Sequence, residues 1–141
     1  MTRWMRVAFC GAMLLVFLAS QAGCNRTADT TGDPELQRVT SGDIDVVLLS
    51  SHSLRQGRDQ FTIEFRSKEG GQLVDVGEVK MTANMPMPGM PMFGNIQVQK
   101  TNVPGRYTAS SEITMAGSWR LKIEWNGPKG MGSADLSGSV Q

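Results

Sequence analysis

The residues Trp119-Arg-Leu-Lys-Ile-Glu-Trp125 decide the fold. Large apolar side chains occupy every second position of this stretch, and charged side chains occupy the positions between them. Because successive side chains of a β-strand point to opposite faces of a sheet, the alternation predicts a strand with one buried face and one solvated face. Trp119 is expected to anchor the core beneath that sheet, as large aromatic side chains at such positions do.

The same two-residue period recurs along the chain on both sides of this stretch. It covers residues 44–49, 61–66, 79–85, 96–99, 107–111 and, less regularly, 134–140. Turn-forming pairs such as Pro104-Gly105 separate the runs, and no run shows the 3.6-residue period of an amphipathic helix. We therefore predict an all-β fold over residues 41–141, an immunoglobulin-like antiparallel β-sandwich of about seven strands. Tyr107 is expected to be a second core anchor. Four carboxylates are expected on solvent faces: Glu64, Glu78, Glu112 and Glu124.

The first residues carry the pattern of an export signal. Arg3 and Arg6 precede an apolar run over residues 7–19, which is shorter than the roughly 20 residues that span a bilayer. Ala22-Gly-Cys24 resembles the lipobox of bacterial lipoproteins, although Gln21 stands where that motif prefers an aliphatic residue. We expect a lipoprotein signal peptide over residues 1–23 and a diacylated Cys24. The alternative is an ordinary signal peptide cut nearby, which would leave Cys24 as a free thiol.

Cleavage before Cys24 defines the rest of the organisation. Residues 24–40 are mostly polar and are expected to form a flexible tether. The whole chain has a formal net charge of +1, and it loses Arg3 and Arg6 with the signal. A nearly neutral chain offers no electrostatic basis for binding nucleic acid. We expect a protein of the cell envelope, attached to the membrane by its lipid and facing the periplasm.

The sequence does not predict an enzyme. His52 is the only histidine, and after lipidation no free thiol would remain, so no conventional nucleophilic site can be assembled. Gly70-Gly71 lies between strands and is expected to form a hairpin turn rather than a phosphate-binding loop.

The most unusual segment is residues 81–92, which hold five of the ten methionines and three prolines. Proline cannot donate to a strand ladder, so the thioethers from Met85 onward are expected on a loop or a sheet edge. Thioether sulfur is a soft ligand that suits Cu(I). The residues predicted to bind Cu(I) are Met85, Met87, Met90 and Met92. We expect pairs of neighbours two residues apart, brought together by a turn at Pro88-Gly89.

Other roles for these methionines stay open. Methionine is a common filler of cores, which is the expected role of Met81 and one alternative for Met85. The loop could instead contact a partner protein, or its thioethers could be targets of oxidants. His52 would be an additional ligand only if the fold brought it to the loop, and the roles of Met115 and Met131 are undecided.

Three motifs in a fixed order resemble the YtkA-like domain family. They are the Met85-to-Met92 loop, Gly105-Arg-Tyr107, and Met115-Ala-Gly-Ser-Trp119. The resemblance implies an exported immunoglobulin-like domain, often lipidated, of the kind that accompanies metal-efflux or copper-enzyme assembly systems. Members often carry a histidine near the methionine loop, and Phe93 follows the loop here.

Two functions follow from these observations. The first is Cu(I) binding by an envelope lipoprotein, for copper trafficking, for efflux or for the assembly of a copper enzyme. The second is a protein-interaction module without metal, which would dock on a membrane-bound partner through the methionine-rich loop.

Overall fold

Eight antiparallel strands form the fold of residues 32–141, the part of the chain that the computed structural model describes. In chain order they are β1 (Glu35–Ser41), β2 (Ile44–Leu49), β3 (Gly57–Ser67), β4 (Glu78–Met85), β5 (Met92–Lys100), β6 (Arg106–Ile113), β7 (Gly117–Gly127) and β8 (Gly130–Val140). The all-β prediction is confirmed, with one strand more than expected. No helix in this part is long and apolar enough to cross a membrane. The expected signal peptide and Cys24 lie outside the described residues.

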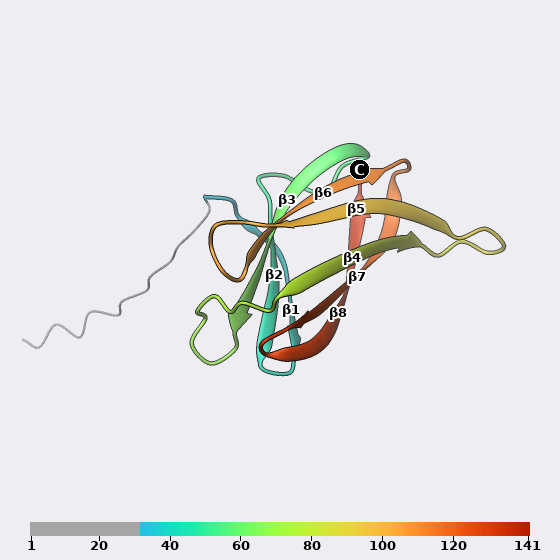
Figure 1. The fold of residues 1–141 in the computed structure, drawn as a ribbon. Coiled ribbons are helices and arrows are strands. Elements are labelled where there is room, and N and C mark those ends of the chain that lie inside the picture. The colour runs from blue at the N-terminus through green and yellow to red at the C-terminus, as the bar shows by residue number, and fades with distance from the viewer. Residues whose placement is uncertain (1–31) are drawn as a thin grey trace, which may run out of the picture.

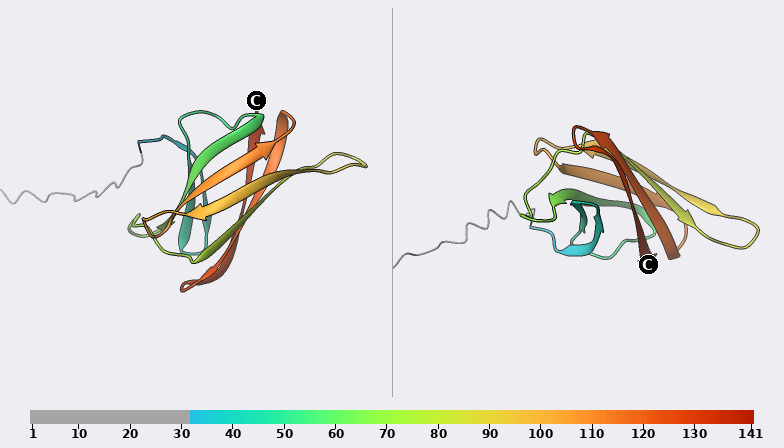
Figure 2. Two further views of the ribbon diagram at one scale, coloured as in Figure 1. Left: turned by 45° about the horizontal axis from the view of Figure 1, so that its top comes forward. Right: turned by 90° about the horizontal axis from the view of Figure 1, so that it is seen from below.

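The strands are hydrogen-bonded in the order β1-β2-β3-β6-β5-β4-β7-β8, and the sheet bends at β5. Residues 92–94 of β5 pair with β4, whereas residues 95–100 pair with β6. The strand thus passes from one layer to the other and links them (Figure 1). At the far ends of the sheet, the Ser41 hydroxyl on β1 donates to the Ser133 carbonyl oxygen on β8 at 2.8 Å. The two layers curve over a shared core in a nearly closed sandwich (Figure 2).

Strand β1 corrects the expected boundary of the tether. Residues 35–40 fall within the expected tether, but they form most of β1. This strand pairs with β2 from Ser41↔Ile44 to Glu35↔Leu49. The strand is mostly polar, and Val39 is the apolar residue that it packs against the core. Its stability comes from pairing with β2 and from polar contacts of Arg38, which hydrophobic alternation does not detect.

Aromatic side chains from three strands meet in the core. The ring of Phe65 meets Tyr107 at a centroid distance of 5.4 Å and Trp125 at 5.3 Å, both edge to face. The Tyr107 hydroxyl donates to the Gly77 carbonyl oxygen at 2.7 Å, and burial raises the pKa of this phenol. Trp119 is also buried, so the prediction that Tyr107 and Trp119 are core anchors is confirmed.

The position of Glu64 differs from the prediction. This carboxylate is fully buried, although alternation along β3 places it on the face away from the core. One carboxylate oxygen accepts from Arg106 Nε at 2.8 Å and the other from Arg66 Nε at 2.8 Å. The two guanidinium groups neutralise the carboxylate and exclude water from it. The other three predicted surface carboxylates are exposed: Glu78, Glu112 and Glu124.

Candidate metal centre

The methionine-rich segment forms a hairpin. Strands β4 and β5 pair from Ala83↔Gly94 to Met85↔Met92, and residues 86–91 connect them. The tip of this hairpin extends away from the sandwich (Figure 1). Met85 and Met92 are direct cross-strand partners, a relation that sets two Cβ atoms about 5 Å apart. The fold therefore brings together two thioether side chains that lie seven positions apart in sequence.

A turn at Pro88-Gly89 reverses the chain at the tip, as predicted. The φ angle of Gly89 is +83°, a value that glycine adopts without strain. Proline followed by such a glycine is the usual centre of a type II turn, whose first and fourth residues lie within about 7 Å. Those residues are Met87 and Met90. The hairpin thus sets Met85 opposite Met92 and Met87 opposite Met90 on its two arms. The sequence had predicted only pairs of neighbours along one arm.

The four predicted ligands differ in their access to solvent. Met90 is 72% exposed and Met87 is 39% exposed, whereas Met92 is half-buried and packs against the core. Met85 is only 7% exposed and belongs to the core itself, as does Met81. The structure therefore places three of the four thioethers where an ion can approach them and gives Met85 a packing role.

A second methionine-bearing segment lies at the base of the hairpin. A Cβ atom on Gly117, at the start of β7, would lie 2.7 Å from Cε of Met85. Met115 is two residues away, in the connection between β6 and β7, and its side chain is 41% exposed. Its carbonyl oxygen accepts from the indole nitrogen of Trp119 at 3.0 Å. Met131 is exposed near the start of β8, where it pairs with Asn126 at the opposite end of β7.

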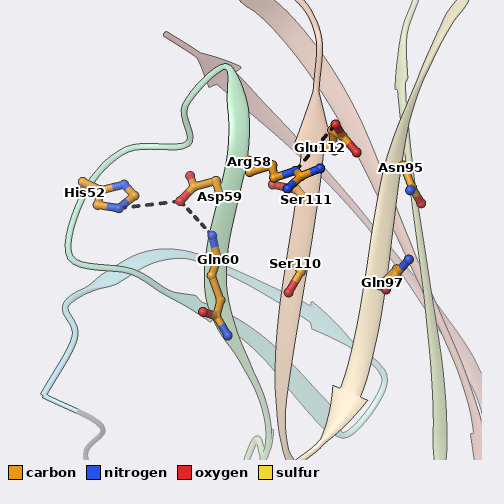
Figure 3. Close-up of a pocket in the computed structure, with 9 residues that line it drawn as sticks. All are labelled: His52, Arg58, Asp59, Gln60, Asn95, Gln97, Ser110, Ser111 and Glu112. Carbon is orange, nitrogen blue, oxygen red and sulfur yellow. Dashed lines mark hydrogen bonds and ion pairs between the residues drawn. The ribbon is translucent and has the colours of Figure 1, made fainter.

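His52 lies in a different environment. Its Nε2 is 3.6 Å from Oδ1 of Asp59, and its Nδ1 lies 3.0 Å from the Ser53 carbonyl oxygen. The histidine lines a polar hollow of about 570 Å³ on strands β3, β6 and β5, shown in Figure 3. The other lining residues are Arg58, Asp59, Gln60, Asn95, Gln97, Ser110, Ser111 and Glu112. No methionine lines this hollow, so the condition for His52 as an additional ligand is not met there.

Sequence reasoning did not find this hollow, because its lining residues are scattered polar positions on three separate strands. Arg58 pairs with Glu112 across the hollow at 3.8 Å, and both side chains are largely exposed. The carboxylate of Asp59 accepts from the backbone N–H groups of Arg55 and Gln60 at 3.1 and 2.8 Å, which fixes the preceding loop. Within residues 32–141, no three or more His, Cys, Asp or Glu side chains are grouped so that they could hold a metal ion.

Comparison with known proteins agrees with the motif order. No curated protein matches the chain. The model of the YtkA-like family matches residues 38–124, a range that includes the methionine hairpin, the Tyr107 strand and the Met115-to-Trp119 segment. Because this match covers more than half of the sequence, the chain belongs to the YtkA-like family.

Proposed function

We propose that this protein binds Cu(I) as cargo through the thioethers of the β4–β5 hairpin. The observation that supports this most directly is the turn at Pro88-Gly89, which sets Met87 opposite Met90 at an exposed tip. Met92, two residues after Met90, is the first residue of β5, and its side chain is half-buried. Three soft donors on one short hairpin suit a soft monovalent ion.

The chemistry of thioethers suits transfer better than storage. Their sulfur atoms carry no charge and no proton, so an ion bound to them need not displace a proton. Cu(I) affinity should therefore change little between neutral and mildly acidic pH, unlike that of a site built from histidine or cysteine. Ligands at an exposed tip also allow an acceptor protein to approach the ion directly.

The cellular part of the proposal rests on the N-terminal sequence. Ala22-Gly-Cys24 supports a lipid anchor in the cell envelope, with the hairpin facing the periplasm. From there the protein would pass copper to an efflux system or to a copper enzyme under assembly.

The test is an anaerobic Cu(I) titration of the protein against a competing chelator. The variant carries Met87→Leu, Met90→Leu and Met92→Leu, and the matched control carries Met131→Leu at the exposed start of β8, beside the other end of β7. Leucine keeps the apolar volume and removes the sulfur, at less than about 1.5 kcal/mol of stability per site. We expect saturable binding that the triple variant loses and the control keeps. Equal binding in all three proteins, or none in any, would exclude the hairpin site.

A second function is favoured by Phe93, which is 74% exposed beside Met92. Together with the exposed Met87 and Met90 of the same hairpin, it offers an apolar surface of the kind that contacts other proteins. In this alternative the hairpin docks on a membrane-bound partner without metal. The Met→Leu variant would then keep its partner, and Phe93→Ser would lose it.

A further inference from the structure

We propose that Met115 supplies a further thioether ligand to the Cu(I) site, so that the site is built from two segments of the fold rather than from the hairpin alone. The proposal rests on the proposed function and names a ligand outside the predicted set. It also gives the site the donor that it lacks if Met85 stays in the core.

Met115 follows a strand that ends at the same end of the sandwich as the hairpin strands. The inward-facing residues of β6 are Tyr107, Ala109, Ser111 and Ile113, all of them buried. Met115 lies two residues past Ile113, at a bend just beyond the end of the strand. Met85 and Met92 occupy the inward-facing positions at the ends of β4 and β5. The end of β4, the start of β5 and the end of β6 therefore each bring a methionine to the same end of the sandwich.

The segment that carries Met115 also lies close to the base of the hairpin. Strands β5 and β6 pair up to Asn95↔Glu112, after which residues 92–94 of β5 pair with β4. The strands stay close for at least one further step, because a Cβ atom on Gly94 would lie 3.4 Å from Cγ1 of Ile113. On β4, the other strand of the hairpin, the methyl carbon of Met85 lies against Gly117, 2.7 Å from where a Cβ atom would be. The segment from Ile113 to Gly117 thus lies along the base of the hairpin.

The backbone of Met115 is held in place while its side chain remains accessible. The buried indole of Trp119 donates to the Met115 carbonyl oxygen at 3.0 Å, which restrains the connection between β6 and β7. The Met115 side chain is 41% exposed, close to the value for Met87. A ligand on a restrained backbone loses less conformational freedom when it binds an ion.

The inferred ligand set is therefore Met87 and Met90 at the tip, with Met92 and Met115 at the base. Met85 remains a core residue beneath them. The ion would lie between the pair of donors at the tip and the pair at the base.

The experiment is NMR of the protein labelled with ¹³C at the methionine methyl groups, during titration with Ag(I) as a redox-stable soft ion. Single Met→Leu variants assign the signals. We expect the methyl signals of Met87, Met90, Met92 and Met115 to shift together and saturate at one equivalent. Met81 in the core and Met131 at the far end should not shift, and they serve as internal controls.

The outcomes separate the two proposals. If no hairpin methyl signal shifts, the proposed function fails. If the hairpin signals shift and Met115 does not, the hairpin site stands and this inference is overturned. As a second measurement, Met115→Leu should weaken Cu(I) binding at least roughly tenfold, since even the loss of an outer-shell partner costs 10–100-fold in known metal sites. Met131→Leu should leave the affinity unchanged.

Discussion

Asp45 on β2 shows how single residues hold the polar strand β1 in place. Its carboxylate accepts from the Thr40 hydroxyl at 2.6 Å and from Arg38 Nη1 at 3.0 Å, and Arg38 also pairs with Glu35 at 2.7 Å. The Thr40 hydrogen bond and, after it, the Arg38 contact hold the pKa of Asp45 below its usual value. The Arg38 hydrogen bond lowers the pKa of Glu35 in the same way. The Thr40 and Arg38 contacts of Asp45 join β1 to β2 by polar interactions rather than by apolar burial.

The lowered pKa of Asp45 predicts a loss of stability in acid. A carboxyl whose pKa is lower in the folded state contributes its full stability above its unfolded pKa, about 4, and loses it as pH falls through the folded value. We expect Asp45→Asn to reduce the free energy of unfolding by about 1–2 kcal/mol at pH 7 and to have a smaller effect at pH 2. Urea denaturation at pH 7, 5, 3 and 2 measures both. Glu124→Gln, in an exposed pair with Lys122, is the control and should change little. An effect of Asp45→Asn that is the same at every pH would contradict the argument.

The β4–β5 hairpin is the element in which fold and proposed function can be separated. Its tip projects from the sandwich, so residues 86–91 contribute little to the core. We expect that replacing these six residues by Asn-Gly, a favoured two-residue hairpin turn, keeps the fold and abolishes Cu(I) binding. Near- and far-UV circular dichroism and thermal unfolding check the fold, and the chelator titration checks the ion. If the shortened protein folds and binds Cu(I) as tightly as before, Met87 and Met90 are not ligands.

Elements differ in how much of them the sequence could predict. The Trp119-to-Trp125 alternation and the Pro88-Gly89 turn were both predictable, since each depends on local chemistry that the structure keeps. Strand β1 was not, because its pairing partner rather than its composition makes it a strand. Glu64 was placed on the correct face of β3, but alternation does not say that Arg66 and Arg106 cover that face. Met115 could not be linked to the hairpin, because their proximity depends on how β5 passes between layers.

At the scale of the whole molecule, the sheet brings its own two edges together. Strands β1 and β8 end the strand order, and the contact between Ser41 and Ser133 joins them. The C-terminal Gln141 is held by backbone hydrogen bonds to Leu54 and Gln56, at 3.1 and 2.7 Å. Exposed strand edges invite pairing with other chains, so this closure protects the domain from edge-to-edge association.

The closure predicts that β1 belongs to the folding unit. A chain that begins at Ile44 loses six cross-strand pairs with β2, each worth roughly 0.2–1 kcal/mol, so the cost is about 3 kcal/mol. That corresponds to a fall in Tm of roughly 12 °C or more, compared with a chain that begins at Gly32. The shorter chain also leaves the apolar strand β2 as a free edge, so we expect it to aggregate on heating. Thermal unfolding with light scattering measures both effects. Equal Tm values would mean that β1 contributes nothing to the stability of the folding unit.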